Sequence, residues 1–415
     1  MPDDDCTVDI DPHALEFLER RHDVYAELRG RCPVAWNARH GGFWVVTDHE
    51  SVASIARDNE TFAHRFEAEP EADGFRYRGI LGVPRPPTVL RQGVSEIDGP
   101  EHADLRRLLH PFLTPQRVEE LRPRAVELAH ELVDGFIQSG EADLVLDFAT
   151  PLPAVLTLDM VGIPSRNWKY FADFFHAGSA YVAGSREFNA AMARWPEMMG
   201  EIQDHIALRR REPADDLTTA LVSGTLDGHP IDDGHLGDIL WNLLAGGIDT
   251  TTSLVSWGLH HLGTHPEDRD RLVAERALVS SAVEEFLRHF CPNEALSRTA
   301  TRDVEISGTT IRRGDLVFIS WVSANHDELV FDRADEVVVD RQVNKHLAFG
   351  LGGHRCIGSH LARMEAQVML DEILERIPDY EIDPGRFVPS PGNPLVTTVV
   401  SMPVSFTPGT RWSPS

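Results

Sequence analysis

The sequence lacks the features that mark a nucleic-acid or membrane protein. Its 39 lysines and arginines are outnumbered by 66 aspartates and glutamates, so the formal net charge is −27. Because binding to nucleic acid depends on basic side chains that replace counterions around phosphate, we expect no nucleic-acid partner. No stretch approaches 18 consecutive apolar residues, and the acidic N-terminus has no signal-peptide pattern. We therefore expect no membrane association and a cytoplasmic location.

Cysteine is scarce and scattered. Cys6, Cys32, Cys291 and Cys356 are the only four, and no two of them form a CxxC pair. In a chain this long, that pattern predicts a reducing, cytosolic environment rather than a disulfide framework. It also leaves no cysteine cluster for an iron–sulfur centre, and no GxGxxG dinucleotide motif follows a predicted strand. Redox chemistry in this protein would therefore need electrons from a separate partner.

What the sequence does contain is helical periodicity over most of its 415 residues, without an internal repeat, linker or composition break. The strongest pattern is one very long helix over residues 231–263. Further helices are predicted over 100–114, 115–139, 150–162, 165–178, 186–211, 266–276, 278–290 and 357–376, and short strands over 43–47, 298–320 and 379–408. Residues 63–95, rich in glycine, proline and arginine, are predicted as a long functional loop. The pattern predicts one domain, 1–415, mainly α with a minor β region.

The sharpest local feature is a glycine-rich loop that carries a cysteine. The segment that starts at Phe349 reads FGLGGHRCIG, and Cys356 stands directly before a predicted helix. Backbone N–H groups and the positive end of that helix can point at the sulfur and hold it as a thiolate. The glycines let the backbone approach something large and flat, and Phe349 can stack beside the sulfur. Taken alone, Cys356 could equally be a buried structural cysteine in a turn.

The long predicted helix contains the sequence LAGGIDTT. Two consecutive glycines inside a helix cost about 1 kcal/mol each relative to alanine, so Gly246 and Gly247 must meet a need for space or a bent hydrogen-bond ladder. Ala245, Gly246, Asp249 and Thr250 fall on one helical face by their spacing. That face offers a small flat surface with an acid and an alcohol beside it. Tight packing against another helix is the alternative explanation for the glycines.

Together these segments resemble the cytochrome P-450 superfamily, and matching motifs run from about residue 40 to the end. The resemblance implies the cytochrome P-450 fold, with haem b held between the 231–263 helix and the helix after Cys356. Cys356 would be the proximal iron ligand, because a thiolate ligand donates electron density and favours O–O cleavage. Ala245 would contact the haem. Asp249 and Thr250 resemble the family's acid–alcohol pair, in which Thr250 stabilises bound dioxygen and Asp249 gates proton delivery.

Other residues match the same family by position. Glu285 and Arg288 form an i, i+3 pair that is common on helix surfaces, but here it resembles the Glu-x-x-Arg motif. Arg341 would be its third member, in a buried charge network that fixes the cysteine loop. Four basic residues resemble the anchors of the haem carboxylates, although each one singly could be a solvated surface charge. They are His102, Arg106, Arg298 and His354.

The resemblance also suggests substrate contacts. By position in the family, Asn293 and Glu294 follow the Glu-x-x-Arg helix, and Leu395 and Val396 lie in the last β portion. Ordinary packing or loop contacts would explain these four residues equally well.

The function implied by the resemblance is monooxygenation. One atom of O2 would enter a small organic substrate by hydroxylation or epoxidation, with electrons from a ferredoxin and a ferredoxin reductase. Arg107, Arg355 and Arg363 would form a basic patch for an acidic ferredoxin. A peroxide-driven haem-thiolate oxidase is one alternative, which the pair Asp249–Thr250 disfavours. A non-catalytic haem sensor is the other, and no output domain accompanies it.

Overall fold

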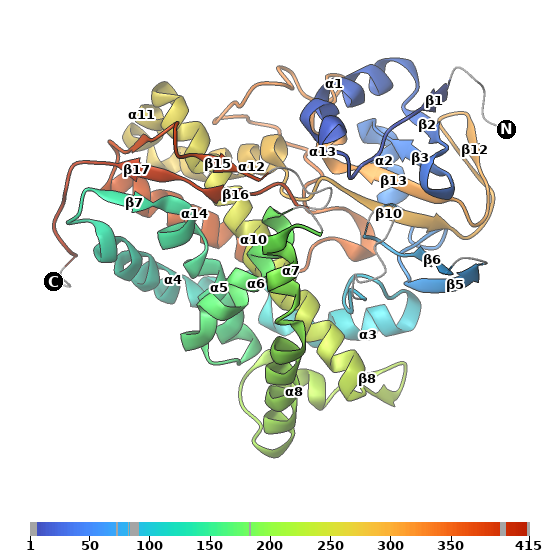
Figure 1. Ribbon diagram of the computed structural model, residues 1–415, viewed down its shortest axis with the longest axis horizontal. Helices are drawn as coiled ribbons and strands as arrows, with labels where there is room; N and C mark the ends of the chain where they lie inside the picture. The colour runs from blue at the N-terminus through green and yellow to red at the C-terminus, as the bar shows by residue number, and fades with distance from the viewer. Residues whose placement is uncertain are drawn as a thin grey trace.

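The structure, a computed structural model, describes residues 6–71, 74–81, 83, 91–181, 184–390 and 396–412. It is mainly α with a minor β region, which confirms the predicted fold class. Figure 1 shows the largest sheet near the N-terminus, while most of the helices and the short C-terminal strands make up the rest of the molecule.

The helices account for most of the chain. In order they are α1 (Leu15–Arg31), α2 (His49–Arg57), α3 (Gly99–Leu109), α4 (Pro115–Phe136), α5 (Pro151–Val161), α6 (Trp168–Ala180), α7 (Arg186–Met192), α8 (Trp195–Arg211), α9 (Leu217–Val222), α10 (Asp233–Thr264), α11 (Pro266–Ala274), α12 (Val279–Phe290), α13 (Trp321–Asn325) and α14 (Ser359–Arg376).

The strands are short. They are β1 (Thr7–Val8), β2 (Val34–Asn37), β3 (Phe43–Val46), β4 (Phe62–Ala63), β5 (Glu67–Glu71), β6 (Gly74–Arg78), β7 (Glu141–Asp143), β8 (Thr225–Leu226), β9 (His229–Pro230), β10 (Ala295–Ala300), β11 (Val304–Ile306), β12 (Thr309–Ile311), β13 (Leu316–Ser320), β14 (Glu381–Ile382), β15 (Val388–Pro389), β16 (Val399–Ser401) and β17 (Pro403–Ser405). The largest sheet has the order β1-β2-β3-β13-β10-β4.

Helix α10 is the long helix that the sequence predicts, and it crosses the centre of the molecule (Figure 1). The Asp232 side chain accepts a hydrogen bond from the N–H of His235 at 2.9 Å and so caps its first turn. The helix packs against α5, α6, α8, α12 and α14. Apolar residues cover most of its circumference because it is buried on several sides.

Two sequence predictions need correction. Residues 186–211 form two helices, α7 and α8, because α8 begins anew at Trp195 with Pro196 in its first turn. The 63–95 stretch is not an unstructured loop, since it contains the antiparallel hairpin of β5 and β6.

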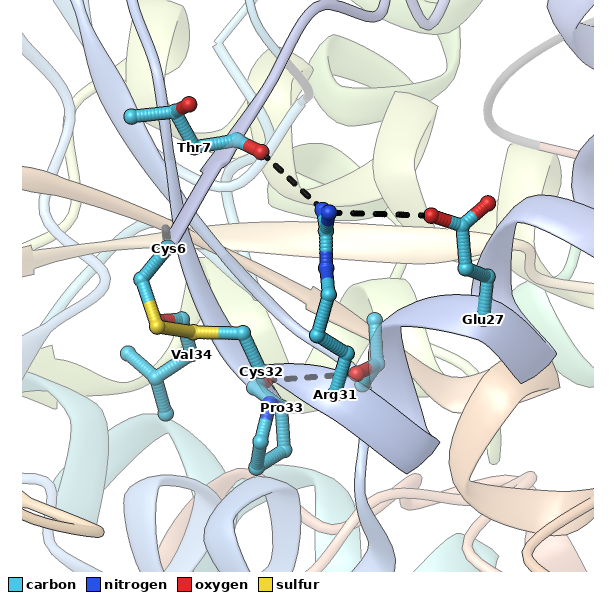
Figure 2. The surroundings of a disulfide bond; sticks show 8 residues. Cys6, Thr7, Glu27, Arg31, Cys32, Pro33 and Val34 are labelled. Atoms are coloured by element: carbon cyan, nitrogen blue, oxygen red, sulfur yellow. Dashed lines mark hydrogen bonds and ion pairs between the residues drawn. A yellow bond between two sulfur atoms is a disulfide. The ribbon is translucent and has the colours of Figure 1, made fainter. Parts of the chain in front are cut away.

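A disulfide joins Cys6 to Cys32, which corrects the expectation of a fully reduced chain. The two Cα atoms are 5.6 Å apart although 26 positions separate the residues. Figure 2 shows Arg31 beside the bond, donating to the carbonyl of Thr7 and pairing with Glu27. The parallel pairing of β1 with β2 carries Cys6 back to the end of α1. Spacing rules look for close cysteine pairs, so they miss a bridge that the sheet creates.

One helical segment, Leu144–Val161, is long and apolar enough to span a membrane by length and composition. Within the protein, 78% of that segment is buried, and its side chains pack in the core with α4 and α10. This burial accounts for its apolar composition without a membrane.

Candidate functional site

A large cavity lies against α10 and the loop before α14. Its volume is about 980 Å³, and both Cys356 and the Ala245–Thr250 face of α10 line it. The predicted basic anchors, Phe349 and the two residues Asn293 and Val396 line it as well. Residues more than two hundred positions apart therefore meet around one cavity.

The loop that carries Cys356 is held by its backbone. The N–H of Cys356 donates to the carbonyl of Phe349 at 2.8 Å. Gly352 has a φ of +72°, and a Cβ there would come within 2.7 Å of the Ala56 carbonyl oxygen on α2. A side chain at this position would therefore push the loop away from α2.

Cys356 has accessible surface on the cavity wall, although the surrounding protein atoms desolvate its sulfur. Burial raises the pKa of this thiol, while the Gly358 N–H and the Arg106 guanidinium act in the opposite direction. A Cβ at Gly358 would lie 4.0 Å from the sulfur. The loop thus presents a single thiol to the cavity beside a helix N-terminus, as a soft metal ligand requires.

The two glycines of α10 have different roles. A Cβ at Gly247 would meet the Thr157 hydroxyl of α5 at 2.5 Å, so this glycine permits close helix packing. A Cβ at Gly246 would meet nothing within 4 Å, because this residue faces the cavity. Thr250 donates its hydroxyl hydrogen to the Gly246 carbonyl at 2.8 Å. The need for open space therefore explains Gly246, and tight packing against another helix explains Gly247.

Asp249 has a partner that the sequence did not reveal. Nδ1 of His176 on α6 lies 3.1 Å from its Oδ1. Burial opposes protonation of His176, but the hydrogen bond to Asp249 and the charges of Asp249, Asp173 and Asp143 together outweigh it and raise the pKa of the imidazole above 6.5. A titratable pair thus sits at the cavity wall, next to Thr250.

The predicted charge network has all three members in contact. Arg288 donates to both oxygens of Glu285, at 2.8 and 2.9 Å, and Arg341 Nε lies 2.9 Å from Glu285 Oε2. Glu285 and Arg288 have no solvent exposure. Although burial opposes ionisation, the two guanidiniums lower the pKa of Glu285. Asn325, whose carbonyl accepts from Arg288, also accepts from the N–H of Leu347 and so links the network to the cysteine loop.

The basic anchors form one cluster at the cavity. The ring of His354 stacks on that of His102 at 3.8 Å, and Arg106 donates to the Arg355 carbonyl at 2.8 Å. Arg298 is only 3% exposed, and its Nε has no partner among the described residues. Burial lowers the pKa of Arg298 to about 9. A buried cation without a carboxylate contact indicates a site for an anionic group.

The four residues suggested as substrate contacts do not share one location in the structure. Asn293 and Val396 form an isolated antiparallel bridge and both line the cavity. Glu294 is fully buried and turns toward α1, where its Oε2 lies 3.0 Å from Arg21 Nε. It is not among the cavity-lining residues. Leu395 lies outside the described residues.

Several other residues line the cavity that the family motifs do not mark. Phe174, Phe175, Trp195 and Trp241 form an aromatic cluster on its wall, with Phe175 and Trp241 stacked at 4.8 Å. The helical spacing of the phenylalanines is equally typical of an ordinary core, so spacing alone does not assign them to the cavity. Glu365 on α14 is 1% exposed, and burial raises its pKa to about 8.

These observations fit a haem. One exposed thiol lies on a cavity wall, a helix face with an open glycine lines the same cavity, and buried cations with an orphaned nitrogen gather at its edge. A flat group with a thiolate-binding metal and two carboxylates matches this donor set.

Comparison with known proteins agrees with this chemistry. Residues 185–401 match the family model described as Cytochrome P450. The chain is 37% identical to mycinamicin IV hydroxylase/epoxidase of Micromonospora griseorubida, over 89% of this chain and 90% of the relative. It is 36% identical to nocardicin C N-oxygenase of Nocardia uniformis subsp. tsuyamanensis, over 95% of this chain and 97% of the relative.

A solved structure gives the same result for the fold. The cytochrome P450 of Mycobacterium marinum in complex with pseudoionone superposes with a TM-score of 0.87 at 29% identity, over 96% of this chain and 99% of that one. On the family match, the extent of both relatives and the shared fold, this chain belongs to the cytochrome P450 family.

Proposed function

We propose that this chain is a haem b-thiolate monooxygenase in which Cys356 is the proximal ligand and residues 1–415 act as one domain. The observation that carries the proposal is that Cys356 and the Gly246–Thr250 face of α10 line the same cavity. Relatives named as a hydroxylase/epoxidase, an N-oxygenase and a steroid monooxygenase support oxygen transfer to an organic substrate.

The haem, when bound, supplies the iron at which O2 is activated. This chain's residues do the rest. The cysteine loop holds the sulfur at the cavity, and the basic cluster of His102, Arg106, Arg298 and His354 binds the haem carboxylates. Thr250 offers a hydroxyl at the open glycine, and Asp249 passes a proton from His176 toward it.

The substrate is an uncharged, largely apolar organic molecule. The cavity wall around α6, α8 and the first half of α10 carries aromatic rings and neutral amides, whereas the cations of the lining gather at the cysteine loop. Asn242 on α10 accepts from the N–H of Val94 at 3.0 Å and ties residues 92–95 over the cavity. The aromatic cluster and this tie exclude water from the reacting position.

Electrons come from a separate protein, since P450 enzymes of bacteria generally use redox partners. A ferredoxin and its reductase are the donors that we propose, in a cytoplasmic setting. Arg355 is exposed, and its guanidinium makes no ion pair with a residue that the structure describes. Of the three arginines suggested from the sequence, it is therefore the one most available to an acidic partner.

The absorption spectrum of the dithionite-reduced protein with carbon monoxide tests this proposal. A strongly red-shifted Soret band in the wild type, lost in Cys356→Ser and kept in Cys291→Ser, is the expected result. Cys291 is the matched control because it is a free, fully buried thiol that does not line the cavity. An unshifted band in the wild type, or no haem at all, would refute the thiolate assignment.

Substitution of Thr250 tests the oxygen-activating role. Thr250→Ala removes the hydroxyl at the cavity while NADH consumption continues, so electrons should leave as hydrogen peroxide instead of product. Unchanged coupling of NADH to product would exclude the proposed role of Thr250.

A further inference from the structure

Three histidine rings stack at the edge of the cavity. The ring of His354 lies between those of His64 and His102, with centroid separations of 3.5 and 3.8 Å and interplanar angles of 12° and 18°. His64 follows β4, His102 lies on α3, and His354 belongs to the cysteine loop. The stack therefore joins three parts of the chain, and His64 lies in none of the motifs recognised in the sequence.

The backbone of His64 is fixed by a hydrogen bond, whereas one nitrogen of its ring has no partner among the described residues. Asp98 Oδ2 accepts from the N–H of His64 at 3.0 Å, while Asp98 Oδ1 lies 3.2 Å from His354 Nε2. The imidazole of His64 is also hydrogen-bonded to the backbone of Ser95. Its Nε2 is buried and has no hydrogen-bond partner among the described residues. A rigid ring thus presents one unsatisfied nitrogen while it lines the cavity.

The described surroundings of that nitrogen hold more cations than carboxylates. Arg298 and Arg106 line the same part of the cavity as the three imidazoles, and Asp98 is the carboxylate that pairs with the stack. Burial and the nearby Arg298 hold the pKa of His64 well below its ordinary value. An anionic group opposite this cluster would stabilise it, because buried cations and donors without partners cost free energy.

We infer that His64 is a direct contact of a haem carboxylate, through Nε2, alongside the four anchors suggested by the family pattern. This inference rests on the proposed function, since it assigns His64 to the site of the same cofactor. Because the bond to Ser95 takes the proton of the neutral ring at Nδ1, the contact takes up one further proton from water, and Nε2–H then donates to the carboxylate oxygen. The stacked His354 and the Asp98 bond hold the ring so that little side-chain entropy is lost when the carboxylate binds.

Two substitutions test the roles of the two ring nitrogens one at a time. In His64→Asn the amide can still reach the Ser95 backbone but has no group at the position of Nε2. In His64→Gln the amide extends to the Nε2 position. The measurement is the rate of haem transfer from the ferric holoprotein to excess apomyoglobin, followed by absorbance. We expect His64→Asn to lose haem about tenfold faster, as for one charge-assisted hydrogen bond, and His64→Gln to restore most of the loss.

Haem dimethyl ester is the control for the carboxylate. This haem has the same ring but no ionisable carboxylate, so wild type and His64→Asn reconstituted with it should lose it at the same rate. His205→Asn is the matched protein control, because His205 on α8 is also buried with an unpartnered Nε2 but does not line the cavity. Its haem transfer rate should equal that of the wild type.

Each outcome decides between the alternatives. A difference between wild type and His64→Asn that persists with the dimethyl ester would show that His64 only stacks and packs, and would overturn the inference. Equal rates with ordinary haem would overturn it too, while the proposed function would stand if the carbon monoxide spectrum shows thiolate ligation. A wild type without haem would refute both.

Discussion

His176 Nδ1 lies 3.1 Å from Asp249 Oδ1 and joins α6 to the acid of the proposed acid–alcohol pair. Both side chains are buried, and Asp249 Oδ2 and His176 Nε2 have no hydrogen-bond partner among the described residues. Asp173 and Asp143 add negative charge around the imidazole. A carboxylate held by one titratable ring can change its hydrogen bonding when that ring gains or loses a proton.

The stability of the protein should therefore depend on pH through His176. Its pKa is raised above 6.5 in the folded state, so its contribution is complete below pH 6.5 and is lost as the pH rises through the higher folded value. In His176→Asn this loss of stability should disappear. The measurement is the free energy of unfolding over that pH range. Substitution of the exposed His229 should leave the pH dependence unchanged. If the free energy of unfolding of His176→Asn depended on pH as steeply as that of the wild type, the coupling between His176 and Asp249 would be contradicted.

The contribution of Glu365 to stability should fall as the pH rises, whereas that of a carboxylate paired with a cation falls as the pH drops. Burial raises its pKa to about 8 from 4.5, so the unfolded chain ionises first and the folded state is progressively destabilised between pH 4.5 and about 8. Glu365→Gln removes this penalty, and its free energy of unfolding should exceed that of the wild type most clearly at pH 8 and above. A Gln variant that is less stable at every pH would show that Glu365 is ionised and paired.

Substitution of Glu285 should destabilise the protein more than substitution of the neighbouring Glu284. Glu285→Gln leaves two buried guanidiniums without their carboxylate, which should cost about 3–5 kcal/mol of stability and lower the haem content. Glu284 pairs with Arg363 and His346 but is 29% exposed, so Glu284→Gln should cost about 1 kcal/mol or less. Urea unfolding and the haem-to-protein absorbance ratio measure both effects. Equal losses in the two variants would argue against the buried network.

The helices and the central motifs could be predicted from the sequence because their signals are local. The Asp232 cap, the apolar pattern of the long helix and the glycines around Cys356 each lie within a few residues. Gly247 shows the limit of such reasoning. The sequence shows that a glycine is needed there, but only the structure shows that Thr157 of α5 is the neighbour.

The remaining site residues could not be predicted because they depend on contacts distant in the chain. His176 reaches Asp249 across 73 positions, and no motif marks it. Glu294 was placed at the substrate by analogy of position, yet its side chain turns toward Arg21 on α1. Local patterns fix which residues lie in a helix or loop, whereas the partner of a buried polar group is fixed by the packing of elements.

The disulfide Cys6–Cys32 should stabilise the protein outside a reducing environment. It closes a loop over 26 positions, and the entropy lost by the unfolded chain corresponds to about 3 kcal/mol. Cys6→Ser and Cys32→Ser should each lower the free energy of unfolding by this amount without added reductant. With reductant the wild type and the variants should agree. Thiol counting under denaturing conditions, which should find two free thiols, supplies the control; four free thiols in the unreduced protein would contradict the bond.

The arginines near the cysteine loop should differ in their effect on electron transfer. Arg363 is paired with Glu284 and stacks over Phe349 at 4.5 Å, and Arg107 is paired with Asp104, so part of their charge is already compensated. Arg355 has no such partner among the described residues. A surface charge that is free to meet an acidic protein acts mainly on the association rate, and its effect falls as salt screens it. Arg355→Gln should therefore slow haem reduction by a ferredoxin several-fold at low salt, more than Arg363→Gln or Arg107→Gln, with the carbon monoxide spectrum unchanged in all three. A larger effect from Arg363→Gln, or no salt dependence, would place the docking surface elsewhere.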